Sequence, residues 1–315
     1  MNFCWSTFLS FLLTMNSSIE NELIISKYAR HLERAWVAPS YFFQNLWITI
    51  YEWFGRDDYT TVVWGTITIA NLCYWIPGLC FTFIDLTGRP AFILKYRIQE
   101  NSPYPVPFNR VIKAFALVVF NQTVVLFVIM FCFYHVMVWR GFEKGETLPT
   151  FQRLMLELGF FIIIEEILFY YSHRLLHHSS IYKYIHKHHH EWTSPIGIVA
   201  LYAHPIEHII CNLLPALIGP CLLGTHIMVY WAWFCLALLT TLNAHTGFHL
   251  PFWPSPEAHN FHHLKFTENY GAMGFLDDLH GTNKNFRNSE IYKRHFWSLS
   301  LAPLKQLYPD KQKGE

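Results

Sequence analysis

The 315-residue chain is too apolar for an ordinary soluble protein, because 52% of its residues are hydrophobic, 18% are aromatic and only 14% are charged. We therefore expect an integral membrane protein. A net charge of +1, with no basic stripe along the chain, argues against nucleic acid as a partner. The seven cysteines lie mostly in apolar runs and form no CxxC pair, which is typical of small hydrophobic residues and not of a disulfide framework.

Residues 1–59 are predicted to form a segment associated with the membrane surface. Residues 3–15 are apolar but short and lack a basic leader, which favours a membrane-lying helix over a cleaved secretory signal. Residues 19–58 carry aromatic side chains at loosely helical spacing among polar ones, a pattern suited to the lipid headgroup zone.

Residues 60–300 form the predicted membrane domain. We expect spans at about 60–84, 114–139 and 154–171 and a helical hairpin at 209–244, since these runs are apolar and long enough to cross a hydrocarbon core of about 30 Å. The loop 85–113 is rich in Lys and Arg, so the positive-inside rule places it in the cytosol. Counting crossings then puts both ends of the hairpin on the cytosolic side.

The tail 301–315 is expected to be cytosolic by the same count. Lys311 and Lys313 occupy the positions of a KxKxx retrieval signal, and a solvated charged tail is the alternative interpretation.

Four histidine blocks stand out. Histidines spaced at i, i+3 and i+4 share one helix face, so we expect each block to close on a single ion. Unpaired imidazoles in such clusters would repel when protonated and would cost several kcal/mol when buried, so the clusters argue for a cation. Imidazole suits iron, copper, nickel and zinc, and two matched halves predict a dinuclear site. The candidate ligands are His173, His177, His186, His189 and His190 in the first half, and His245, His249, His259, His262 and His263 in the second.

The third expected span contains three glutamates, which need partners because a carboxylate in lipid is costly. Glu166, Tyr170, His173 and His177 follow i, i+4, i+7 and i+11, so one helix face carries a carboxylate, a phenol and two ligands. Glu166 and Tyr170 are therefore candidates for orienting the ligands, with an interhelical hydrogen bond as the alternative for Glu166. Further candidates near the ligands are Glu191, Glu207, Glu257, Asp277, Asp278, His204, His208 and His280.

The predicted fold is therefore all-α: a polytopic membrane protein whose cytosolic, histidine-rich helical cap holds a dimetal site. Its sequence blocks resemble the fatty acid hydroxylase and sterol desaturase superfamily and, within it, the C4-methyl sterol oxidase branch. The likeness covers about residues 85–300. It is carried by EEILFYYSHRLLHH, YKYIHKHHHEW, LYAHPIEH, HTGFHLPFWPSPEAHNFHHLKF and LDDLHGT.

The resemblance implies a di-iron mono-oxygenase of the endoplasmic reticulum membrane that receives electrons from NAD(P)H through cytochrome b5 and its reductase. The ligand pattern of the superfamily, HxxxH, HxxHH, HxxxH and HxxHH, falls on all ten histidines named above. The chain has no HPGG, GxGxxG or P-loop signature, so we expect a separate electron donor.

The expected reaction is oxidation of a lipid C–H bond with O₂ at two iron ions, which zinc would replace on overexpression. The methyl group of a 4-methyl sterol in sterol biosynthesis is the expected target. A fatty-acyl or sphingolipid hydroxylase or desaturase is one alternative, and a metal-binding transporter or a regulatory non-enzyme is another. A transporter needs ligands near the bilayer midplane, whereas these histidines are predicted at helix ends.

Overall fold

The computed structural model describes residues 27–31, 33–34, 41–99 and 102–309. These residues are mostly helical and include no strand, only an isolated bridge between Arg97 and Phe248. The expected all-α architecture is confirmed. The apolar stretch 3–15 and the KxKxx positions of the tail lie outside the described residues.

Four helical segments are long and apolar enough to cross a membrane: Thr60–Thr87, Phe108–Arg140, Pro205–Leu223 and Ile227–His245. They contain the expected first and second spans and the expected hairpin. The segments are built from η1 (Thr60–Gly65) and α4 (Thr66–Thr87), from α6 (Phe108–Phe120), η2 (Asn121–Val125) and α7 (Leu126–Arg140), from α10 (Pro205–Glu207), η5 (His208–Leu213) and α11 (Leu214–Leu223), and from α12 (Ile227–His245).

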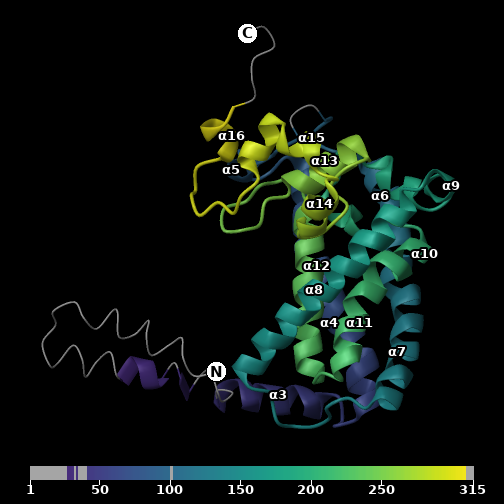
Figure 1. Ribbon diagram of the computed structural model, residues 1–315, viewed down its shortest axis with the longest axis vertical. Coiled ribbons are helices and arrows are strands. Elements are labelled where there is room, and N and C mark those ends of the chain that lie inside the picture. The colour runs from purple at the N-terminus through teal and green to yellow at the C-terminus, as the bar shows by residue number, and fades with distance from the viewer. Residues whose placement is uncertain (1–26, 32, 35–40, 100–101, 310–315) are drawn as a thin grey trace, which may run out of the picture.

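The third expected span lies in α8 (Phe151–Leu176), which runs beside α11 and α12 (Figure 1). With 26 residues, α8 is about 39 Å long, enough to cross a bilayer. It is not among the four apolar segments, since it carries several charged residues. Of these, Glu157 is buried and ion-paired with Arg153, their Oε1 and Nε atoms lying 2.5 Å apart, and it also accepts a hydrogen bond from the Thr225 hydroxyl. The carboxylate of Glu157 is thus satisfied within the protein.

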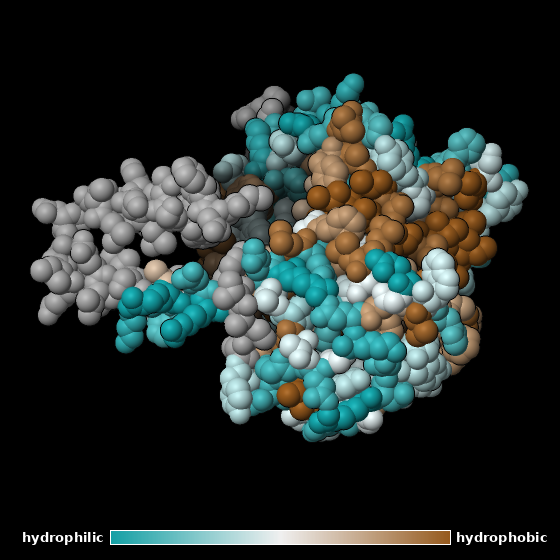
Figure 2. Space-filling model, turned by 60° about the horizontal axis from the view of Figure 1, so that its bottom comes forward, coloured by the Kyte–Doolittle hydropathy of each residue, from teal (hydrophilic) through white to brown (hydrophobic). Residues whose placement is uncertain are grey.

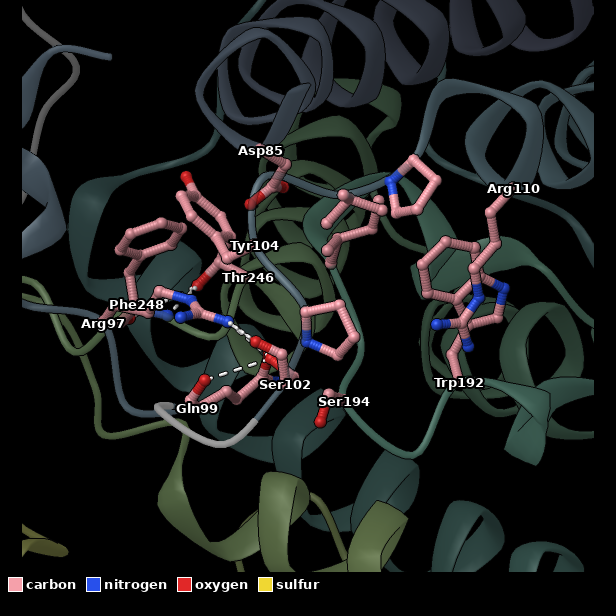
Figure 3. A pocket seen from close by; sticks show the side chains of 14 residues that line it. Asp85, Arg97, Gln99, Ser102, Tyr104, Arg110, Trp192, Ser194, Thr246 and Phe248 are labelled. Atoms are coloured by element: carbon pink, nitrogen blue, oxygen red, sulfur yellow. Dashed lines mark hydrogen bonds between the residues drawn. The ribbon is translucent and has the colours of Figure 1, made fainter. Parts of the chain in front are cut away.

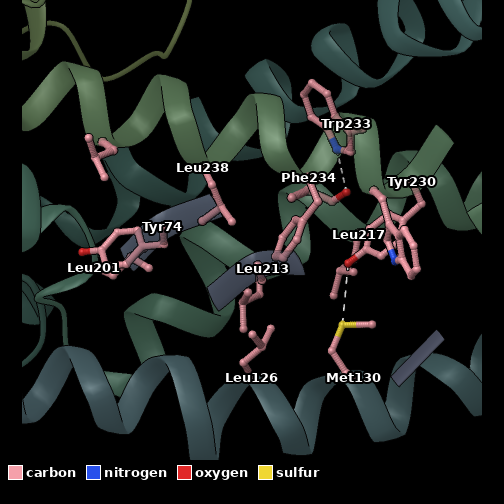
Figure 4. Packing of buried hydrophobic residues seen from close by; sticks show 14 of the residues in the cluster. Tyr74, Leu126, Met130, Leu201, Leu213, Leu217, Tyr230, Trp233, Phe234 and Leu238 are labelled. Atoms are coloured by element: carbon pink, nitrogen blue, oxygen red, sulfur yellow. Dashed lines mark hydrogen bonds between the residues drawn. The ribbon is translucent and has the colours of Figure 1, made fainter. Parts of the chain in front are cut away.

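Large side chains from α4, α7, α11 and α12 form the core between the helices, and several of their polar atoms are paired (Figure 4). Tyr230 donates its hydroxyl to the sulfur of Met130 at 3.6 Å, and the Trp233 indole donates to the Ala216 carbonyl at 2.9 Å. The Asn121 amide donates to the carbonyl of Leu201 at 3.0 Å. Because buried polar groups that lack a partner are costly, the first two bonds hold the bundle helices together. The Asn121 bond fixes the connection after the first histidine half onto the bundle.

The outer surface of the bundle is apolar. On the face shown in Figure 2, hydrophobic side chains gather over the helices, with hydrophilic side chains above and below them. Exposed residues of α4 include Leu72, Ile76, Leu79 and Phe83. A continuous apolar surface of this kind suits contact with lipid.

Helix α3 (Tyr41–Trp53) lies across the end of the bundle that is far from the C-terminal helices (Figure 1). It buries Trp47 against Trp231, with ring centroids 5.7 Å apart, while Tyr41, Phe42 and Trp53 are exposed. This arrangement is consistent with the expected position in a headgroup zone, which stays a prediction.

A cap covers the other end of the bundle, where α4, α8 and α12 end (Figure 1). The chain after α5 (Ala91–Leu94) ties the cap together, since the amide of Ile98 donates to the Gly247 carbonyl and the amide of His249 donates to the Tyr96 carbonyl, both at 2.9 Å. Histidines of both halves meet at this end. The cap contains α5 (Ala91–Leu94), α9 (Ser179–Tyr182), η3 (His186–Glu191), η4 (Gly197–Leu201), α13 (Glu257–Lys265), α14 (Phe275–His280), α15 (Lys284–Arg287), η6 (Glu290–Arg294) and α16 (Leu304–Leu307).

Two glycines of the first span allow a matched test of helix packing. A Cβ added at Gly65 would lie 2.5 Å from the Trp231 ring, which is held in place by a 2.9 Å bond from its indole to Thr66. A Cβ at Gly78 would lie 3.6 Å from Leu242, an ordinary contact. Because overpacking costs about 1–3 kcal/mol, we expect Gly65→Ala to lower the apparent melting temperature in detergent by several degrees and Gly78→Ala to leave it unchanged. Equal melting temperatures for the two variants would contradict the close approach of α12 to η1.

Candidate metal centre

Nine of the ten predicted ligands come together at the cap end of the bundle, in two groups. Within each group the candidate ligand atoms lie within 4.8 Å of one another. They come from the end of α8, from η3, from the last residue of α12 and from α13 (Figure 1). Group one consists of His173, His177, His186, His190 and His262, and group two of His189, His245, His259 and His263.

The two HxxHH blocks are divided between the groups, contrary to the expectation that each block closes on one ion. In η3, which is a 3₁₀-helix, His190 belongs to group one and its neighbour His189 to group two. In α13, His262 and His263 divide in the same way. Consecutive side chains on a helix point about 100–120° apart, so neighbours cannot face one point. Each block therefore links the two groups.

The Nε2 atoms of group one converge on a small space. The Nε2 atom of His190 lies 2.9 Å from that of His186, 3.2 Å from that of His262 and 3.3 Å from that of His177. The Nε2 atom of His173 lies 3.1 Å from that of His186. Two nitrogens that each lie about 2.1 Å from one ion, at an angle of about 90–110°, are roughly 3.0–3.4 Å apart. The observed separations match the ligand spacing of a single ion.

Group two has the same spacing. The Nε2 atom of His245 lies 3.3 Å from that of His189 and 3.0 Å from that of His259. The Nε2 atom of His263 lies 3.2 Å from that of His259. The four nitrogens again surround one point.

Backbone carbonyls orient most of these rings. Each carbonyl accepts a hydrogen bond from a histidine Nδ1, so that nitrogen carries the proton and Nε2 presents a lone pair. The bonds run from His173 to Tyr270 (2.7 Å), from His262 to Glu268 (2.7 Å), from His245 to Thr241 (2.7 Å), from His263 to Trp192 (3.0 Å) and from His189 to Tyr202 (3.2 Å).

Burial keeps the imidazoles in the neutral form that binds metals. It lowers the pKa of His189 to about 4. Burial, with neighbouring imidazoles, holds the pKa values of His262 and His263 well below the usual value of histidine. Neutral rings whose lone pairs face one another repel at this distance, and a cation between them removes the repulsion. The residues present therefore fit two transition-metal ions that prefer imidazole.

His249, the tenth predicted ligand, lies outside both groups. Helix α12 ends at His245, and Gly247 turns the chain with a φ of 72° into the bridge between Phe248 and Arg97. The HTGFH block is therefore not on one helix. Because the helix ends at its first residue, His245 and His249 do not share a helix face as expected. The side chain of His249 is buried beside Arg97 and other residues of the cap.

Glu166 acts on the site through a loop. Its carboxylate accepts hydrogen bonds from the amides of Ala272 (2.8 Å), Met273 (2.7 Å) and Gly274 (3.1 Å). The same loop supplies the Tyr270 carbonyl that orients His173. Glu166 thus positions a ligand indirectly, which is neither direct contact with a ligand nor a simple hydrogen bond between helices.

Asp277 supports the same loop, since it accepts hydrogen bonds from the amides of Tyr270 (2.9 Å) and Gly271 (2.7 Å). Tyr170 contacts the Tyr270 ring of this loop, with centroids 6.3 Å apart, and stacks on His280, with centroids 5.2 Å apart. Its hydroxyl lies 3.1 Å from that of Thr282. Three side chains singled out in the sequence therefore shape the surroundings of the ligands.

Of the other candidates, Glu207 reaches a ligand, with its Oε1 atom 2.8 Å from Nδ1 of His186. The other candidates contact residues outside the two groups: Glu191 contacts Tyr202, Glu257 contacts Arg294, Asp278 contacts Arg287, His204 contacts the amide of Ile206, and His208 contacts Asn212.

The orienting role of Glu268 was not predicted from sequence. Its carbonyl accepts from His262, and its carboxylate accepts from the amides of Asn285 (3.0 Å) and Phe286 (2.8 Å). The sequence offered only an acidic residue five positions after the last block, because the direction of a carbonyl has no signature in residue type.

A cavity of about 390 Å³ lies beside both groups, lined by His173 and His186 from group one and by His189, His245 and His259 from group two. A smaller cavity of about 40 Å³ lies among α8, η5, α11 and α12. The two cavities share the lining residues Glu165, Phe169, Cys211, Asn212 and Thr241.

A separate cavity of about 80 Å³ lies between the chain after α5 and the cap. Asp85, Arg97, Arg110 and Trp192 line it, without a histidine of either group (Figure 3).

Comparison with known proteins places this site in a family. Residues 158–282 match the fatty acid hydroxylase family, a range that includes every predicted ligand. The chain is 44% identical over 283 residues to fatty acid hydroxylase domain-containing protein 2 of Homo sapiens, covering 90% of this chain and 85% of that one. It is 35% identical over 249 residues to fatty acid hydroxylase ahd1 of Mycosarcoma maydis (78% and 64% covered) and 32% identical over 257 residues to methylsterol monooxygenase 1 of Rattus norvegicus (78% and 84% covered). No solved structure matches the chain. The chain therefore belongs to the fatty acid hydroxylase family.

Proposed function

We propose that this protein is a di-iron mono-oxygenase of the endoplasmic reticulum membrane that oxidises the methyl group of a 4-methyl sterol. The observation that carries the proposal is the convergence of nine histidines in two groups beside a cavity, at the end of apolar helices. Two iron ions held there would supply the reducible centre at which O₂ attacks an unactivated C–H bond. Family membership and a relative named as a methylsterol monooxygenase support this reaction class.

Residues of this chain would hold the metal ions and orient the histidine rings. Backbone carbonyls and Glu207 fix the histidine rings, while Glu166 and Asp277 hold the loop that contributes one of those carbonyls. The cavity of about 390 Å³ falls within the range of roughly 300–1,000 Å³ that is usual for ligand pockets. Its continuation among the helices suits a lipid that enters from the bilayer.

Electrons are proposed to come from NAD(P)H through cytochrome b5 and its reductase, and cytochrome b5 is proposed to dock on the cytosolic side of this protein. The basic loop after α4 lies at the same end as the cap (Figure 1), which by the positive-inside rule supports a cytosolic cap and tail. A fatty-acyl hydroxylase is the second candidate, favoured by the name of the Mycosarcoma maydis relative. A transporter is disfavoured, since the histidine groups lie at helix ends.

Metal content tests the two groups directly. We expect the purified protein to carry two metal ions per chain, one in each group. His262→Ala removes a ligand from the middle of group one and should lose about one ion and the activity. His249→Ala serves as the matched control and should keep both ions, because His249 lies outside the groups. Elemental analysis of folded samples measures the metal content of each variant. Loss of metal in His249→Ala would show that His249 is a ligand after all, as the sequence pattern predicted.

The supporting role of Glu166 is tested by Glu166→Gln. In the wild type, the carboxylate accepts hydrogen bonds from backbone N–H groups of the loop. The glutamine NH₂ would face one of these donors, so the loop whose carbonyl orients His173 would be held less firmly. Loss of such a supporting group costs roughly 10–100-fold in metal affinity or activity, and we expect a loss in that range. Glu52→Gln, an exposed change on α3, is the control. Equal turnover and metal retention in the two variants would exclude the role.

Reconstitution tests the substrate. With cytochrome b5, its reductase, NAD(P)H and O₂, the metal-loaded protein should convert a 4-methyl sterol to products oxidised at the methyl group, detected by mass spectrometry. If the sterol remains unchanged while an acyl lipid is hydroxylated, the sterol assignment fails and the mono-oxygenase assignment survives.

A further inference from the structure

The smaller cavity is mostly apolar but contains polar atoms without a protein partner. Leu201, Leu213 and Phe234 are among its apolar lining. Gln122 and His208 line it too, although they are only 2% and 1% exposed. Among the described residues, the Nε2 atom of each side chain has no hydrogen-bond partner.

Both of these atoms are donors. The Asn212 amide nitrogen lies 3.2 Å from Nδ1 of His208 and donates to it, so the imidazole proton is on Nε2. The Gln122 Nε2 atom belongs to the amide NH₂. A buried donor without an acceptor costs about 1–3 kcal/mol. Other donors in the same bundle, such as the indole of Trp233, have acceptors. The pair therefore points to an oxygen atom that a ligand supplies.

Glu165 adds the complementary group. Its side chain lines both the smaller cavity and the cavity beside the histidine groups. It precedes His173 by two helical turns on α8, about 12 Å along the axis. The two donors thus line the smaller cavity, and the carboxyl group lies where that cavity meets the larger one.

We propose that Gln122, His208 and Glu165 form a subsite that binds a hydroxyl group of the lipid substrate. A hydroxyl both accepts and donates, so it satisfies the two N–H donors and the carboxyl group together. A ketone accepts only, and a lipid without an oxygen at this position offers neither group. The inference rests on the proposed function, since the lipid bound here is the one that is oxidised.

The subsite also narrows the class of substrates that we expect. In a 4-methyl sterol, the hydroxyl is attached to the ring carbon next to the one that bears the methyl group. The larger cavity extends from Glu165 to both histidine groups, so a hydroxyl held beside Glu165 directs the ring that bears it toward those groups. The subsite therefore selects sterols over lipids of similar length that lack the hydroxyl.

Equilibrium binding to the metal-loaded protein tests the subsite without turnover. The probes are a radiolabelled 4-methyl sterol, its 3-ketone and its 3-deoxy analogue. The wild-type protein should bind the alcohol about tenfold or more tightly than the deoxy analogue, with the ketone in between, as expected for loss of one or two hydrogen bonds. Gln122→Leu and His208→Leu should each remove most of that preference.

Thr82→Val is the control, because it removes a buried hydroxyl from α4 outside both cavities. It should keep the preference for the alcohol. If the preference is absent in the wild type, or persists in both leucine variants while only their stability changes, the donors serve a buried water and the subsite is wrong. A protein that prefers the alcohol but never oxidises it overturns the proposed function and leaves the subsite standing.

Discussion

The site depends on holding several uncharged imidazoles with their lone pairs aimed at a common point. Such nitrogens do not attract one another, so the positions of the rings need support from outside the groups. Backbone carbonyls supply it, with Nδ1–O distances of 2.7 Å at His173, His245 and His262. The rest of the structure can be understood as a means of keeping those carbonyls and rings in register.

Two kinds of scaffold share this task. Membrane helices provide rigid placement, since α8 carries His173 in its last turn and α12 ends at His245. The cap provides carbonyls from irregular chain, which would be mobile without further bonds. Glu166 and Asp277 supply such bonds, because each accepts from consecutive amides of the same loop. A carboxylate in a helix and a loop more than a hundred residues later thereby act as one support.

The apolar surroundings give polar atoms a diagnostic value. Between packed elements of the bundle, donors such as those of Trp233 and Asn121 have acceptors. Around the smaller cavity, the donors of Gln122 and His208 lack acceptors. Because water is scarce between membrane helices, we interpret a donor with an acceptor as part of the fold and a donor without one as evidence for a ligand. The same rule that explains the stability of the bundle therefore supports the proposed hydroxyl subsite.

The membrane class, the position of the helices and the four histidine blocks were determined by the sequence alone, because hydropathy and spacing of three or four residues are local properties. Even α8 was found, although Glu157, Glu165 and Glu166 make it unusually polar. The tertiary structure decided how each HxxHH block divides between two groups and why His249 belongs to neither. These features depend on where a helix ends and on which distant carbonyl faces a ring, and residue spacing along the chain records neither.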